Sequence, residues 1–125
     1  MSVLIDSDIL IEVLRGRDQA ILARWVALAE SSAPILISPI ALAEVGAGAF
    51  ENEIDKIARL FAPLTCVPID RKIGQRAGEF LSRYGKSHGL KIADALVAAA
   101  AIQSQSALWT RNRKHYPMPE LCFYA

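Results

Sequence analysis

The sequence lacks the features that mark several classes of protein. It has only two cysteines, Cys66 and Cys122, each in a short apolar run with no second Cys or His at ligand spacing. Neither a disulfide framework nor a zinc site is therefore predicted, and we expect both thiols to be buried and reduced. With 14 Lys and Arg against 13 Asp and Glu, no excess of one charge identifies a partner.

Long apolar runs are also absent. The longest, residues 95–102, has eight residues, whereas a membrane-spanning helix needs ~20. The apolar start at residues 1–5 is interrupted by Asp6, Asp8 and Glu12, a pattern unlike that of a secretory signal. We therefore expect a cytoplasmic protein with no membrane segment.

The chain does contain enough apolar material for a single domain over residues 1–125. It is 53% hydrophobic and 22% charged. At this length, folding buries roughly two thirds of the surface that the unfolded chain exposes. A full core can therefore form without a disulfide or a metal.

Short apolar runs predict the strands of a buried sheet. They are brief and mostly non-alternating, which is typical of parallel strands covered on both faces. The runs are residues 3–5, 35–37, 65–67, 107–109 and 121–123.

Helical patterns separate these runs. Asp18, Ser38 and Asp70 are predicted N-caps, and Pro39 suits the first helical position. Further helices are expected over residues 9–15, over 91–103, and over 50–61 with Ile54, Ile57 and Phe61 facing inward. Strands that alternate with helices predict an α/β fold, a three-layer α/β/α sandwich around a mainly parallel sheet of four or five strands.

Three acidic residues fall where such a fold binds ligands, beyond the carboxyl ends of its strands. Asp6 directly follows the first strand, and Asp94 lies in the first turn of an apolar helix. Glu44 lies among apolar and small neighbours in SPIALAEVGAGA, where burying a lone carboxylate is costly. Each acid has a structural explanation of its own, as a helix cap or as a charge that complements a helix dipole.

Convergence of the three acids would give them a joint role. Carboxylates that lie close together repel one another, so they must share protons or hold a cation. Oxygen-only ligands favour Mg²⁺ or Mn²⁺ over zinc. A water activated by such an ion can attack a phosphodiester.

Four segments of the chain carry a resemblance to a known family. They are VLIDSDILIEVLRG (residues 3–16), ISPIALAEVGAG (37–48), GLKIADALVAAAA (89–101) and LWTRNRKHY (108–116). In this order they resemble the PIN-domain ribonucleases, specifically the VapC toxins of toxin-antitoxin pairs. The resemblance spans nearly the whole chain and implies that Asp6, Glu44 and Asp94 bind the metal. It also implies that Thr110 and Asn112 lie beside them.

The last segment departs from the family pattern. Many relatives carry an acid at the position of Asn112 or of His115, and this chain has an acid at neither. The missing fourth carboxylate argues against a second tightly held metal. We expect Asn112 to orient a water by hydrogen bonding, and Asp8 is a candidate outer ligand.

The resemblance implies a Mg²⁺- or Mn²⁺-dependent endoribonuclease that arrests growth by cutting RNA used in translation. It also implies a VapB-type antitoxin whose peptide lies across the acidic groove, and a homodimer formed through exposed parts of helices 50–61 and 70–85. Basic residues near the acids are candidates for contacts with RNA phosphates. They are Lys86, His88, Lys91, Arg111, Arg113, Lys114 and His115.

Two other functions fit parts of the sequence. Asp6-Ser7-Asp8 matches the start of an Asp-x-Asp phosphatase motif, but such enzymes carry a small hydroxyl residue where this chain has Leu10. That motif also leaves Glu44 unexplained. A non-enzymatic binding module of the same fold is the second alternative, and it would tolerate Asp6→Asn and Asp94→Asn.

Overall fold

A four-stranded parallel sheet forms the centre of the molecule, with its strands in the order β3-β2-β1-β4. The computed structural model describes residues 1–125. The strands are β1 (Ser2–Ile5), β2 (Ile35–Ile37), β3 (Thr65–Cys66) and β4 (Ser106–Trp109). Val3 of β1 lies opposite Ile35 of β2, and Ile5 lies opposite Trp109 of β4. Because every pair is parallel, all four strands end at the same edge of the sheet.

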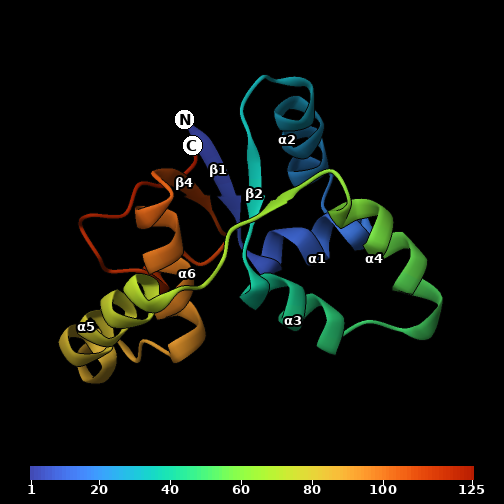
Figure 1. The fold of residues 1–125 in the computed structure, drawn as a ribbon. Coiled ribbons are helices and arrows are strands. Elements are labelled where there is room, and N and C mark those ends of the chain that lie inside the picture. The colour runs from blue at the N-terminus through green and yellow to red at the C-terminus, as the bar shows by residue number, and fades with distance from the viewer.

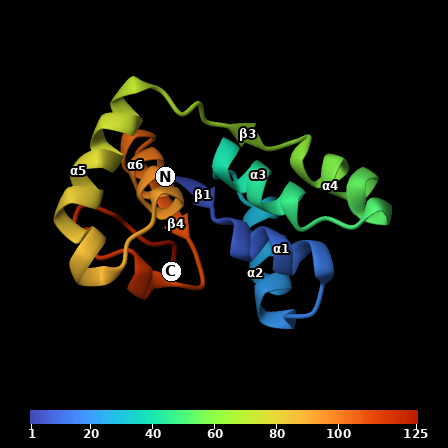
Figure 2. The ribbon, with the colours of Figure 1, turned by 90° about the horizontal axis from the view of Figure 1, so that it is seen from below.

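Helices cover both faces of this sheet, as Figures 1 and 2 show. On one side lie α5 (Arg71–His88) and α6 (Ile92–Gln103). On the other lie α1 (Ser7–Arg15), α2 (Gln19–Glu30), α3 (Pro39–Ala47) and α4 (Ile54–Phe61). Two short 3₁₀ helices, η1 (Glu51–Glu53) and η2 (Arg113–His115), complete the order. The predicted three-layer α/β/α fold is confirmed, and no helix has the length and apolar character needed to cross a membrane.

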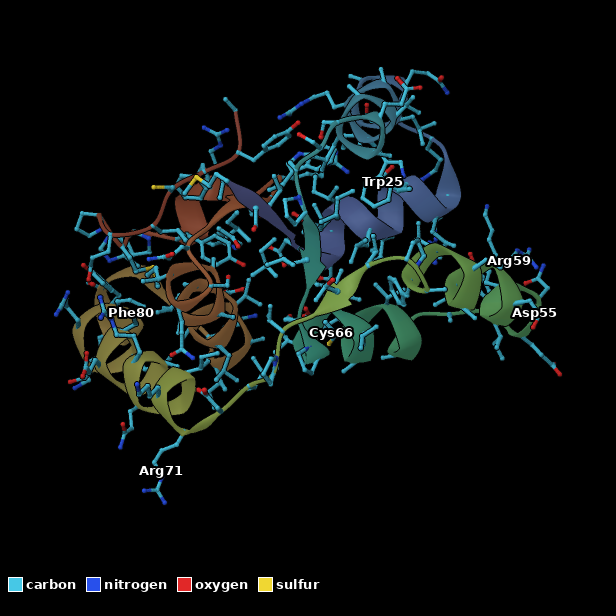
Figure 3. The ribbon with its side chains drawn as sticks, turned by 45° about the horizontal axis from the view of Figure 1, so that its top comes forward. Trp25, Asp55, Arg59, Cys66, Arg71 and Phe80 are labelled. Atoms are coloured by element: carbon cyan, nitrogen blue, oxygen red, sulfur yellow. The ribbon has the colours of Figure 1, made fainter.

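The apolar strands supply two cores, one on each face of the sheet. Leu4 packs with α5 and α6, in a cluster that includes the fully buried Phe80 and the alanines of α6. The side chain of Phe80 is labelled in Figure 3. Val3 and Ile5, the neighbours of Leu4 in β1, point to the opposite face of the sheet and join the cluster beneath α1, α2 and α3. Successive strand residues thus enter different cores, which explains the absence of polar alternation.

The predicted helix caps are confirmed. Asp18 accepts hydrogen bonds from the backbone N–H groups of Ala20 and Ile21, and Ser38 accepts one from Ala41. Asp70 accepts one from Ile73. These bonds satisfy N–H groups that have no partner within the helix.

Several predictions about burial are wrong, and all concern the edges of the molecule. Cys66 and Cys122 are both exposed, because β3 is an edge strand and Cys122 lies beside the opposite edge. The predicted strand at residues 121–123 is reduced to one parallel bridge between Phe123 and Leu108. The predicted helix over residues 50–61 begins as η1, and Ile54 is 59% exposed instead of facing inward.

Candidate active site

Asp6 lies at the junction of β1 and α1, at the carboxyl edge of the sheet. Its backbone N–H donates to the carbonyl of Trp109, which ties the end of β1 to the end of β4. The side chain caps α1 by accepting a hydrogen bond from the N–H of Ser7 on Oδ1. Its second oxygen, Oδ2, accepts one from the Tyr116 hydroxyl at 2.8 Å. The carboxylate is therefore buried and held on both sides.

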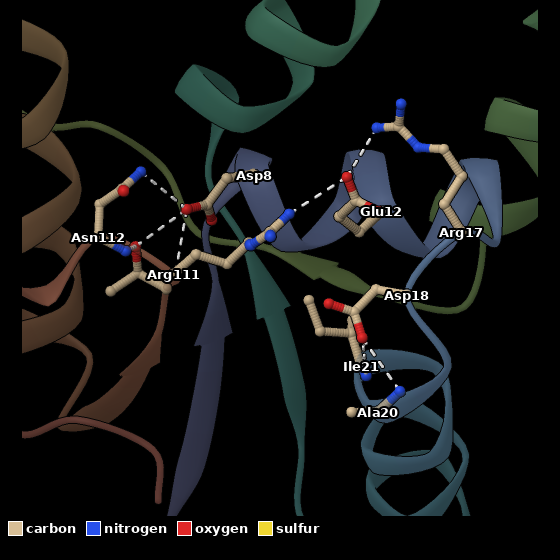
Figure 4. Close-up of polar contacts among 9 residues, drawn as sticks. Asp8, Glu12, Arg17, Asp18, Ala20, Ile21, Arg111 and Asn112 are labelled. Atoms are coloured by element: carbon tan, nitrogen blue, oxygen red, sulfur yellow. Dashed lines mark hydrogen bonds and ion pairs between the residues drawn. The ribbon is translucent and has the colours of Figure 1, made fainter.

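Asp8 lies in the first turn of α1 and faces the loop after β4. Its Oδ2 accepts hydrogen bonds from Thr110 Oγ1, from the backbone N–H of Arg111 and from Asn112 Nδ2, as Figure 4 shows. Its Oδ1 is buried without a hydrogen-bond partner. Burial, and secondly the nearby Asp6 carboxylate, raise the pKa of Asp8 to about 6.

Glu44 reaches the same edge of the sheet from α3. It is exposed, so the expected cost of burying it among apolar neighbours does not arise. Its Oε1 accepts a hydrogen bond from the Ser7 hydroxyl at 3.0 Å. Ser7 directly follows Asp6, so this bond places Glu44 beside the first acid of the site.

Asp94 approaches from the start of α6. It is partly buried, and its pKa is raised first by that burial and then by the Asp6 carboxylate. Because Asp6 raises the pKa of both Asp8 and Asp94, its carboxylate lies close enough to repel each of them. His115 lowers the pKa of Asp94 and so partly offsets this repulsion.

A cavity of about 420 Å³ opens beside these acids. Glu44 and Asp94 line it together with three basic side chains, His88, Lys91 and His115. The other four predicted phosphate contacts do not line the cavity. Arg111 pairs with Glu12 at 3.2 Å, Arg113 donates to the carbonyl of Tyr124, and Lys86 and Lys114 are exposed. The wall of the cavity thus carries both acidic and basic side chains.

The acids do not form a closed metal cage, since no three His, Cys, Asp or Glu side chains lie close enough together to hold an ion. Their chemistry nevertheless fits a hydrated divalent cation. All the candidate metal ligands are carboxylate oxygens, and Asp6 repels both Asp8 and Asp94. In addition, Asp8 Oδ1 is buried and accepts no hydrogen bond. Mg²⁺ typically keeps several waters and uses only one or two carboxylates.

Some residues at the site were not predicted from the sequence. Tyr116 contacts Asp6, and Ser7 contacts Glu44. The buried Glu12 holds Arg17 at 2.7 Å as well as Arg111, an arrangement visible in Figure 4. The signal for Tyr116 is that a buried tyrosine hydroxyl needs a hydrogen-bond partner. The sequence alone does not show that this partner lies 110 positions away.

Comparison with known proteins identifies the family. The model of the PIN domain family matches residues 3–121. The chain belongs to the PIN-domain family. Among its relatives is a protein of Mycobacterium tuberculosis named Ribonuclease VapC10, which is 37% identical over 120 residues, 94% of this chain and 88% of that one. Ribonuclease VapC19 of the same organism is 32% identical over 94% of this chain and 95% of the relative.

Solved structures share the fold of this PIN domain. A chain of the VapBC2 complex of Rickettsia felis, bound to a DNA fragment from its promoter, matches with a TM-score of 0.81. It is 23% identical over 99% of this chain and 98% of that one. A chain of a toxin-antitoxin complex from Klebsiella pneumoniae matches with a TM-score of 0.75 and 25% identity, over 96% of this PIN domain and 95% of that chain. The family assignment favours a nuclease over the Asp-x-Asp phosphatase.

Proposed function

We propose that this PIN domain is a metal-dependent endoribonuclease and the toxin of a VapC-type toxin-antitoxin pair. The observation that carries the proposal is the meeting of Asp6, Glu44 and Asp94 at one edge of the sheet, beside a cavity that also has basic side chains. Relatives named Ribonuclease VapC and the similarity to VapBC complexes support it.

Asp6, Glu44 and Asp94 would hold the cation, either Mg²⁺ or Mn²⁺, in part through its water molecules, because no three of the acids lie close enough together to contact one ion directly. When bound, such an ion supplies Lewis-acid polarisation of a phosphoryl oxygen and a water of lowered pKa. Asn112 acts at the edge of the site by donating to Asp8 Oδ2 at 3.2 Å. This bond fixes Asp8 next to Asp6, while the remaining polar atoms of the Asn112 amide stay available to orient a water.

Basic side chains of the cavity would position the RNA. Lys91 precedes α6, and His88 and His115 line the same hollow. They are exposed, so their N–H groups can reach phosphate oxygens without breaking a buried contact. Contacts of this kind hold the RNA backbone in place without selecting a base.

Purified protein should therefore cut RNA from a total-RNA or tRNA pool when Mg²⁺ or Mn²⁺ is present, and EDTA should abolish the cutting. We expect Asp6→Asn to lower the cleavage rate by at least about 100-fold, because Asp6 would hold the cation that stabilises negative charge in the transition state. Loss of such electrostatic stabilisation costs a factor of this order. Asp55→Asn is the matched control, since Asp55 is an exposed acid on α4, away from the site (Figure 3). Folded protein that cuts no RNA, with or without metal, would instead support the binding module.

A VapB-type antitoxin is the proposed partner, and it would act by covering the acidic edge. The carboxylate of Asp6 repels those of Asp8 and Asp94, and the three would accept a basic side chain from an antitoxin peptide. Co-expression with a VapB-type antitoxin that binds this chain should restore growth that the chain alone arrests. A homodimer is also proposed, and sedimentation of the purified chain would test it.

A further inference from the structure

Tyr116 makes the only side-chain hydrogen bond to the carboxylate of Asp6. Its hydroxyl donates to Asp6 Oδ2 at 2.8 Å. Tyr116 is 4% exposed and Asp6 is 8% exposed, so water does not compete for this bond. The distance is that of an ordinary O–H···O hydrogen bond, and bonds to a carboxylate are among the stronger polar contacts in a protein.

The ring that carries this hydroxyl is fixed by packing. Tyr116 belongs to the core cluster between the sheet and α5 and α6, and its ring meets Phe123 edge-to-face at 6.5 Å. Its backbone N–H donates to the carbonyl of Arg113 at the start of η2. The hydroxyl is therefore presented to Asp6 from a rigid position, and His115, the preceding residue, lines the cavity.

Two donors together set the plane of the Asp6 carboxylate. The Ser7 N–H binds Oδ1 and the Tyr116 hydroxyl binds Oδ2. Each carboxylate oxygen has two lone pairs, so both oxygens can still contact a cation while the donors stay in place. Without the hydroxyl, only the bond at the N-cap of α1 would remain, and the carboxylate could turn about its Cβ–Cγ bond.

We propose that Tyr116 is a positioning residue that holds Asp6 in the orientation required for the divalent cation and so sets the affinity of the site for that ion. The inference deepens the proposed function and rests on it, since it requires that Asp6 binds a metal. Hydrogen-bond partners of metal ligands typically change metal affinity by 10- to 100-fold when removed.

The test is the affinity of the purified full chain for Mn²⁺, measured without RNA by titration calorimetry and by the electron paramagnetic resonance of free Mn²⁺. Tyr116→Phe keeps the ring and removes only the hydroxyl, and we expect it to weaken Mn²⁺ binding by about 10-fold. Tyr124→Phe is the matched control, because the Tyr124 ring packs on Trp109 at 5.3 Å and its hydroxyl makes no hydrogen bond. It should bind Mn²⁺ like the wild type.

Asp6→Asn separates the failure of this inference from the failure of the proposed function. If the wild type binds no Mn²⁺, or if Asp6→Asn binds it equally well, the metal site itself is wrong. If Asp6→Asn loses binding but Tyr116→Phe binds Mn²⁺ as tightly as the wild type or more tightly, the role of Tyr116 is overturned.

The metal dependence of RNA cleavage gives a second readout. A positioning defect should be rescued by excess Mn²⁺, so the cleavage rate of Tyr116→Phe should approach that of the wild type at saturating metal. A general loss of folded structure would leave the rate low at every Mn²⁺ concentration. That second outcome would contradict the proposal.

Discussion

Only one of the two carboxylate oxygens of Asp8 accepts hydrogen bonds in the folded protein. Three donors from the loop after β4 contact Oδ2, whereas Oδ1 is buried with no partner. Burial and the neighbouring Asp6 raise its pKa to about 6. The folded protein therefore binds a proton at Asp8 more tightly than the unfolded chain, whose aspartates have a pKa of about 3.9. Without a cation, the ionised form of Asp8 destabilises the fold.

The free energy of unfolding of the metal-free protein should therefore depend on pH through Asp8. Protonated Asp8 adds to the free energy of unfolding. This stabilisation is fully present below about pH 4 and is lost as the pH rises through about 6. Asp8→Asn removes this titration, so its stability relative to the wild type should increase between about pH 4 and about pH 7. Urea unfolding at a series of pH values in EDTA measures this difference.

Asp55→Asn serves again as the control, because Asp55 is exposed and lies on α4, away from the acids of the site. Its stability relative to the wild type should change little over the same pH range. A difference between Asp8→Asn and the wild type that is constant with pH would show that Asp8 does not titrate in this way.

Single residues were predictable where the chemistry is local and were missed where it depends on the fold. The capping roles of Asp18, Ser38 and Asp70 follow from the few residues that come after each of them. The contact of Tyr116 with Asp6 joins opposite ends of the chain, so no local pattern contains it. The roles of Asp6, Glu44, Asp94 and Asn112 as site residues remain predictions, although the structure brings the three acids to one edge.

Among the helices, α5 and α6 share one stabilising residue, because the N-cap of α5, Asp70, also contacts the end of α6. Asp70 Oδ1 accepts from the N–H of Ile73 at the start of α5, and Oδ2 accepts from the Gln103 side chain at the end of α6. These two helices pack against each other in the same core. The N–H bond, more than any other contact, lowers the pKa of Asp70 below its ordinary value of 3.8. The ionised cap thus supports both helices.

Replacement of Asp70 by alanine should lower the melting temperature at neutral pH. Because its pKa is lowered in the folded state, the stabilisation is present above the ordinary value of 3.8 and is lost as the pH falls through the lower folded value. The difference in melting temperature between wild type and Asp70→Ala should therefore shrink in strong acid. Asp70→Asn keeps the capping oxygen without the charge, and it should retain most of the stability with no such pH dependence.

The elements themselves were largely predictable, and the errors have one physical origin. Apolar runs predict buried parallel strands, and capping residues predict the starts of helices. An apolar run does not reveal whether its strand lies at the centre of the sheet or at its edge. For that reason Cys66 was wrongly expected to be buried, and the run at residues 121–123 was wrongly expected to form a full strand.

For the molecule as a whole, positive and negative charges nearly balance. The net charge is +1 at pH 7, so a general attraction to RNA is weak, and the basic side chains near the acids are those that line the cavity. RNA binding should therefore depend on the few basic side chains that line this cavity. In the absence of divalent metal, which prevents cleavage, the affinity for single-stranded RNA should fall as salt is added.

Lys91→Ala should reduce the slope of log affinity against log salt concentration by about 1, because one phosphate contact is lost. Lys72→Ala is the control, since Lys72 is an exposed lysine of α5 that does not line the cavity. Fluorescence anisotropy at several salt concentrations gives both slopes. Equal slopes for Lys91→Ala and the wild type would exclude Lys91 from the RNA-binding surface.

The two exposed cysteines mark opposite borders of the sheet. Cys66 lies in β3 at one end of the strand order, and Cys122 lies next to the bridge that flanks β4 at the other end. The chain has no other cysteine. A donor and an acceptor dye attached to these thiols would therefore report the width of the sheet by energy transfer. The native sequence thus allows the separation of the strands to be followed during unfolding without the introduction of a cysteine.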